Sequence, residues 1–374
     1  MIVESWRYTT ACFKEALGFL QQFAVLRCEE MVMLSQTNYS VSNAASILGE
    51  AYMYRARGYF EFTKHRKRLD HLATEQRNIL SRQIRDRAAT WATAPVASVL
   101  MIMLINITLD GNTDPAQPWM ADVSDFIIRT TKGRQDLPSF DKDLIRLCQL
   151  VDVLNSVSRF QYPGGSDFTS GILHTEPTSV EQIKLLTPCL LNDDVDYIMS
   201  AVWNWGILQR RMIEWVDDTV KSPSPYLSPE EKVKGIEIIC EASSLQSRLL
   251  RCYMDLPNDS EFNHQLLALY SYWTLVGISQ QLRHPHWRML RCDLPVMALD
   301  QLHQYALTTL DSIGELTDRA GLSAAMFLPV VLSMGFEMTT NEDRNRALDL
   351  LGNTQARYFD FSPKFQWRLL GSWG

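Results

Sequence analysis

The sequence predicts an all-α fold, organised as one large multi-helix domain with a buried central helix. Glycine and proline are sparse among the 374 residues, at 17 and 15. No run of alternating apolar and polar residues recurs, so strands are not favoured. The segment 88–109 contains no charged residue, whereas apolar residues elsewhere recur at helical spacing. These observations together favour polar helices wrapped around one apolar helix.

The first third of the chain is predicted to hold two helices before its basic segment. Residues 5–34 carry apolar side chains near helical spacing, and 37–43 form a polar break. Ser42 or Asn43 is the expected cap of a second, aromatic-rich helix that runs to about Thr63. We expect residues 1–44 to form an N-terminal helical extension of a main domain at 45–374.

A basic segment follows at 64–87, with eight Lys or Arg against three Asp or Glu. It opens with Lys64, Arg66, Lys67 and Arg68, and its apolar residues keep helical spacing. One interpretation is the solvated face of an amphipathic helix. The other is a nuclear-localisation or phosphate-contacting patch made of these four cations.

The uncharged run at 88–109 permits two interpretations. A membrane span needs about 18 or more apolar residues. Here several Ser, Thr and Asn dilute the run, Pro95 interrupts it, and its strongly apolar part is only 96–109. That length favours a helix buried inside a large domain, so we expect no membrane span.

The remaining helices are predicted from caps and breakers. Ser228, Pro229 and Glu231 form a strong helix start, because serine caps, proline fits the first turn and glutamate completes a capping box. Asn341 is the expected cap of a later helix. A turn is expected at 284–287, and 172–192 is expected to be irregular. The predicted helices span about 119–129, 141–160, 193–218, 228–256, 258–283, 292–318, 321–338, 341–358 and 364–373.

The net charge and the cysteine spacing limit which classes of partner and metal site are expected. The net charge of −7 disfavours binding of nucleic acid by the whole surface, since duplex binding depends on neutralising phosphates. The seven cysteines lack Cys-x-x-Cys spacing. They are therefore interpreted as reduced thiols of an intracellular protein, without disulfides or a zinc site.

No catalytic, cofactor-binding or metal-binding set is predicted. The acidic groups Asp193, Asp194, Asp196 and Asp217, Asp218 resemble Mg²⁺-diphosphate sites only weakly, because further carboxylates one helical turn away are missing. His284, His286 and His303 lack zinc-ligand spacing, and the first two are expected at the surface. We therefore expect a protein that is not an enzyme, although its aromatic helices leave room for an apolar pocket.

Several helical segments, taken in order, resemble the regulatory domain of fungal binuclear zinc-cluster transcription factors, the fungal-specific transcription factor domain. They lie at 96–109, 144–163, 185–215, 264–278 and 324–351. The resemblance implies a nuclear transcription regulator that senses a small apolar ligand or metabolite, forms a homodimer or contacts coregulator proteins. The six-cysteine module of that family is not in this chain, so DNA contact is implied only through a module that this chain lacks. A helical enzyme resembling terpene cyclases and a helical scaffold are the alternatives.

Overall fold

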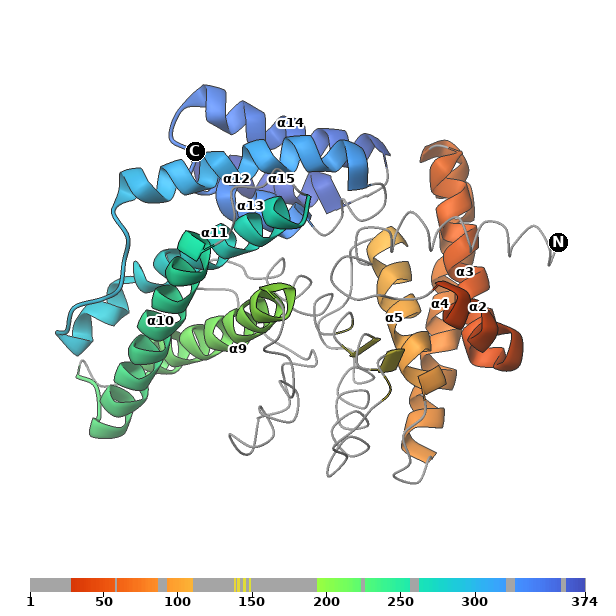
Figure 1. Ribbon diagram of the computed structural model, residues 1–374, viewed down its shortest axis with the longest axis horizontal. Coiled ribbons are helices and arrows are strands. Elements are labelled where there is room, and N and C mark those ends of the chain that lie inside the picture. The colour runs from red at the N-terminus through yellow and green to blue at the C-terminus, as the bar shows by residue number, and fades with distance from the viewer. Residues whose placement is uncertain are drawn as a thin grey trace.

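A computed structural model describes residues 28–57, 59–86, 93–109, 194–222, 226–255, 262–320, 327–357 and 361–373, with single positions between 138 and 148. Helices dominate these residues, and no strand occurs among them, which confirms the all-α prediction. Predicted features at 5–27, 119–129 and 162–192 lie outside the described residues. Figure 1 shows two groups of helices, α2 to α5 and α9 to α15.

The first group surrounds α5 (Thr93–Leu109), which packs on α3 (Tyr39–Ala56) and α4 (Tyr59–Asp86). The buried position of this apolar run is confirmed where its side chains are described, at 96–102, 104 and 105. Ser98 is fully buried, and its hydroxyl donates to the Ala94 carbonyl at 2.9 Å, so its burial leaves no unpaired donor. Among the described helices, none has the length and apolar content that crossing a membrane requires.

The boundary between α2 (Cys28–Thr37) and α3 corrects the predicted cap. Asn38 is the one residue between these helices, and its Oδ1 accepts hydrogen bonds from the Ser40 and Val41 amides at 3.1 and 3.3 Å. An asparagine cap satisfies amides two and three residues ahead, so neither Ser42 nor Asn43 is needed. The prediction that this helix continues to about Thr63 was also wrong, because α3 ends at Ala56 and α4 begins at Tyr59. The division between residues 44 and 45 remains a prediction, and α3 runs across it.

The second group surrounds α11 (Phe262–Leu282), which packs on α9 (Asp194–Lys221), α10 (Pro229–Asp255), α12 (Leu299–Ala320) and α13 (Leu328–Gly335). Every residue from 269 to 279 is buried. The remaining elements of this group are η3 (Pro285–Leu290), α14 (Asn341–Arg357) and α15 (Phe361–Trp373). Helix α11 is therefore a second buried helix, in addition to the predicted α5.

The start of α10 confirms the predicted capping box. The Ser228 hydroxyl accepts from the Glu231 amide at 3.1 Å, and the Glu231 carboxylate accepts from the Ser228 amide at 2.6 Å. The helix expected from 292 instead begins at Leu299, since Pro295 would interrupt it. The apolar helix expected at 321–338 is described only as α13, at 328–335.

The start of α14 corrects a second cap. The Thr340 hydroxyl oxygen accepts from the Asp343 amide at 3.2 Å and donates to the Asp343 carboxylate at 2.5 Å. Thr340 therefore caps the helix, and Asn341 is its first residue.

Candidate functional site

The predicted basic patch lies on the outer face of α4. One face of this helix is apolar and fully buried against its neighbours, through Phe62, Leu69, Ala73, Leu80 and Ile84. On the other face, Lys64, Lys67 and Arg68 are exposed, and Arg66 is half-buried. The four predicted cations thus share one end of an amphipathic helix, where a partner can reach them.

Ion pairs within the chain neutralise part of this patch. Arg68 pairs with Glu50 of α3, and the Arg66 Nε lies 4.0 Å from the Asp70 carboxylate. The described ion pairs of the patch do not involve Lys64 or Lys67. Exposed pairs contribute about 0–1 kcal/mol each, so the patch remains available to an acidic partner.

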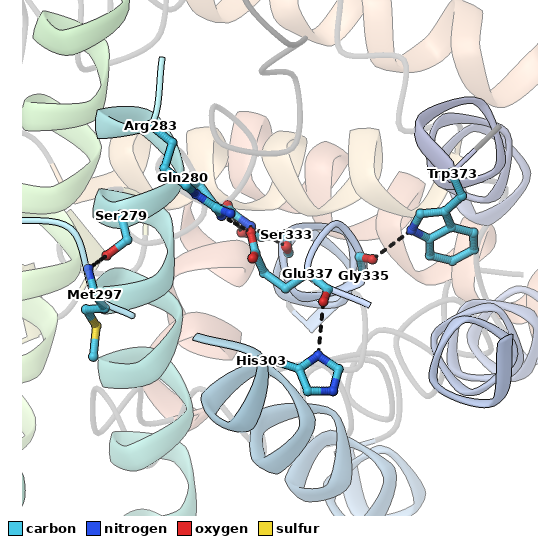
Figure 2. A network of polar contacts seen from close by, with 9 residues as sticks. All are labelled: Ser279, Gln280, Arg283, Met297, His303, Ser333, Gly335, Glu337 and Trp373. Atoms are coloured by element: carbon cyan, nitrogen blue, oxygen red, sulfur yellow. Dashed lines mark hydrogen bonds and ion pairs between the residues drawn. The ribbon is translucent and has the colours of Figure 1, made fainter. Parts of the chain in front are cut away.

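A polar network near the C-terminus was not predicted, and Figure 2 shows it. It centres on Glu337, just after α13, whose side chain is only 8% exposed. The Glu337 carboxylate pairs with Arg283 and accepts from Gln280 Nε2 at 2.8 Å. Burial of a carboxylate is costly unless charged or polar donors pair with it, and these two donors supply that pairing.

The same network ties α11 to the helices that follow it. Gln280 Nε2 also donates to the Ser333 carbonyl at 2.8 Å, and the Ser333 hydroxyl donates to Gln280 Oε1 at 3.0 Å. His303 Nδ1 donates to the Glu337 carbonyl at 3.1 Å, and Trp373 Nε1 donates to the Gly335 carbonyl at 3.1 Å. Its polar groups satisfy one another, so the network positions α11, α12, α13 and α15 relative to each other.

His284 and His286, which the sequence placed at the surface, are half-buried. Their rings stack at 5.1 Å, and His284 caps η3 by accepting from the His286 amide at 3.4 Å. Partial burial, and then the neighbouring His286, lowers the pKa of His284, with Asp217 opposing. A neutral His284 suits its role as a hydrogen-bond acceptor.

The acidic groups do not converge in the part of the chain that is described. Asp218 is exposed and lies 3.6 Å from the Lys234 amine, while the side chains of Asp193, Asp194 and Asp196 lie outside the described residues. No group of three potential metal ligands occurs among the described side chains.

Helices α9 and α11, which pack on each other, each carry buried polar atoms without a hydrogen-bond partner. Trp205 and Gln209 are one turn apart on α9, and Trp273 and Thr274 are neighbours on α11. Four of their polar atoms are buried and lack a hydrogen-bond partner: Trp205 Nε1, Gln209 Oε1, Trp273 Nε1 and Thr274 Oγ1. Buried polar atoms in folded proteins nearly always have partners, so these four atoms depart from the usual pattern.

Gly277 brings the two helices close at this contact. A Cβ atom on Gly277 would lie 2.5 Å from Trp205 Cζ2 and 3.0 Å from Trp205 Cε2. Because Cε2 is bonded to Nε1, the indole N–H of Trp205 lies against α11, within about one turn of Thr274. The sequence predicted aromatic helices with room for a pocket, and these residues were not singled out because their pairing depends on the packing.

Comparison with known proteins gives no match: no family model, no curated protein and no solved structure matches this chain. The resemblance to fungal transcription factors therefore rests on the order and character of the helical segments alone. The functional conclusion has to be built from those segments and from the α9/α11 contact.

Proposed function

We propose that this chain is the regulatory domain of a fungal-type transcription regulator and has no catalytic activity. The observation that carries the proposal is the order of the resembling segments. Where they are described, they fall on α5, on α9, on α11 and on α13 with α14. In this proposal the protein acts in the nucleus, contacts coregulator proteins and reaches DNA only through a module outside this chain.

The proposed ligand is a small, mostly apolar metabolite that carries hydrogen-bonding oxygens. The unpartnered indole N–H groups of Trp205 and Trp273 would donate to such oxygens, and the surrounding aromatic surface would cover the apolar part. These groups support a ligand-sensing domain over a plain scaffold, because a scaffold has no need for buried polar atoms without partners.

In this proposal α11 carries the response from the ligand to the C-terminal helices. Trp273 and Thr274 lie near its middle, while Gln280 lies near its end and Arg283 just beyond it, where both contact Glu337. A ligand that shifts α11 would strain those contacts and so bias α13 and α14. The enzyme alternative gains no support from Asp218, whose carboxylate faces Lys234.

The test is a reporter assay in fungal cells. The full chain is fused to an unrelated sequence-specific DNA-binding domain, and reporter output is compared with that domain alone. We expect a several-fold change in output, and we expect Thr274→Val, which removes a buried hydroxyl, to alter it. Thr308→Val is the matched control, since the Thr308 hydroxyl is exposed and bonds only to its own helix.

Two outcomes would contradict the proposal. One is reporter output equal to that of the DNA-binding domain alone with the fusion protein present and folded. The other is Mg²⁺-dependent turnover of a prenyl diphosphate by the purified chain, which would support the enzyme alternative.

A further inference from the structure

The outer face of α10 carries a row of uncharged residues at alternating spacings of three and four. We call this row the α10 seam; it consists of Val233, Ile236, Cys240, Ser243, Ser247 and Leu250. All six are exposed except Ser243, which is half-buried, and the large side chains are 57%, 47% and 39% exposed at Val233, Ile236 and Leu250. The spacing is that of the a and d positions of a heptad, the positions at which one helix packs on another.

The opposite face of α10 already has its partners. Gly235, Ile238, Ala242, Leu245 and Leu249 are buried, and the helix packs there on α9, α11 and η3. The exposed charged residues of α10 lie beside the seam and never within it, at Glu230, Lys232, Lys234, Glu237, Arg248 and Arg251. An uncharged row with charged borders is typical of a helix-pairing surface, whereas singly scattered exposed apolar residues are common and need no partner.

The sizes of the seam residues indicate what covers it. The bulky Val233 and Ile236 lie in the N-terminal half, and the small Ser243 and Ser247 lie in the C-terminal half. A parallel pair of identical seams would face Ser243 with Ser243 and Ser247 with Ser247, and so leave the C-terminal half of the seam poorly packed. An antiparallel pair places each bulky residue on a small or complementary one.

We propose that α10 pairs antiparallel with α10 of a second copy of this chain, about a two-fold axis between Cys240 and Ser243. In that pair Ile236 packs on Ser247 of the second copy, and Val233 packs on Leu250 of the second copy. Because a two-fold interface is self-complementary, each contact occurs twice.

Charge at one border of the seam fits the same arrangement. Glu230, Glu237 and Arg251 are separated by multiples of seven residues, so all three lie along the same edge of the seam. Antiparallel pairing about the proposed axis brings Glu230 to within about 3 Å, measured along the helix, of Arg251 of the second copy, and two such pairs form by symmetry. The purpose of this dimer rests on the proposed regulatory function, but the contact itself is testable without it.

The first experiment measures the molar mass of the purified full chain by sedimentation equilibrium over a range of concentrations. We expect a concentration-dependent rise toward twice the monomer mass, and Ile236→Glu should abolish it. Leu299→Glu is the matched control, because Leu299 is 64% exposed on α12 and lies outside the seam. Circular dichroism checks that both variants keep their helices.

The second experiment determines whether the two α10 helices run antiparallel. It uses a short bismaleimide cross-linker, which joins thiols about 10 Å apart or less. Across the proposed axis two copies of residue 233 lie about 26 Å apart along the helix, whereas residue 233 lies beside residue 250 of the second copy. In a Cys240→Ser background, Val233→Cys with Leu250→Cys should therefore cross-link, and Val233→Cys alone should give only the background of the Cys240→Ser protein.

A chain that stays monomeric at all concentrations would overturn the proposal, as would a dimer unaffected by Ile236→Glu. Cross-linking of Val233→Cys alone would show a parallel pair and overturn the proposed geometry. A dimer of the expected geometry with no reporter response would contradict the proposed function but support the proposed interface. Failure of the function and failure of the interface are therefore distinguishable.

Discussion

The absence of a side chain at Gly277 allows α9 and α11 to pack closely. Trp205 packs directly on its backbone, and a Cβ atom would lie 2.5 Å from the indole. Trp205 is 1% exposed, so moving its indole aside would disturb the packing of the residues around it. We predict that Gly277→Ala lowers the free energy of unfolding by about 1–3 kcal/mol through overpacking, as measured by urea denaturation.

Gly314 is the matched control for this substitution. It also lies inside a helix, α12, but a Cβ atom there meets only Leu350 Cδ2 at 3.7 Å. Gly314→Ala should raise the free energy of unfolding by about 0.5–1 kcal/mol, because alanine restricts the unfolded backbone and glycine does not. Equal urea midpoints for the two variants would contradict the packing seen at Gly277.

The helix caps show where residue-level prediction succeeds and fails. The capping box at Ser228 was predictable because two side chains within one turn satisfy each other. At Asn38 and Thr340 the true cap lies a few residues before the expected one or next to it. Several Ser, Thr and Asn compete at each of these boundaries, and only the backbone path decides between them.

At the scale of single elements, α5 offers the sharpest test of the fold. Leu100 is fully buried in it, among residues that carry no charge. Leu100→Asp would bury a carboxylate without a partner, which costs several kcal/mol, against a typical total stability of about 5–15 kcal/mol. We predict that this variant loses its cooperative thermal transition or melts far below the wild type by circular dichroism.

The matched charge change is Arg68→Asp, on the exposed face of α4. It removes the pair with Glu50, and exposed pairs contribute about 0–1 kcal/mol, so the thermal midpoint should stay close to that of the wild type. A Leu100→Asp protein that melts together with Arg68→Asp would refute the central place of α5.

The α11 helix was harder to assess from its sequence than α5. Its buried stretch includes Ser271, Thr274 and Ser279, residues that are common on surfaces. Four neighbouring helices cover it on all sides, and that coverage has no local sequence pattern. The polar network at its end depends on the same packing, since Arg283 and Glu337 are 54 residues apart.

At the scale of the whole molecule, the basic patch on α4 tests the proposed nuclear role. Reversing Lys64, Arg66, Lys67 and Arg68 to glutamate changes exposed or half-buried positions only. We predict that a fluorescent fusion of this variant accumulates less in the nuclei of fungal cells, while the purified protein keeps its thermal midpoint to within a few degrees. The reason is that a nuclear-import receptor recognises clustered cations, whereas the fold depends on the opposite face of α4.

A control variant separates the patch from overall charge. It reverses four exposed cations outside α4, namely Lys221, Arg248, Arg288 and Arg291. This variant has the same net charge and should keep its nuclear signal. Equal nuclear accumulation of both variants and the wild type would reduce the patch to the solvated face of a helix.

The sequence alone determined the all-α class, the approximate extent of several helices such as α9, α10 and α14, the buried run within α5 and the cations on α4. These features depend on residues within one or two helical turns, whose spacing and capping act locally. Only the tertiary structure decided that α11 is a second buried helix, that Glu337 meets Gln280 and Arg283, and that Trp205 of α9 packs on Gly277 of α11. The reason is that these contacts join residues dozens of positions apart, and which helix faces meet is set by the packing of the whole domain.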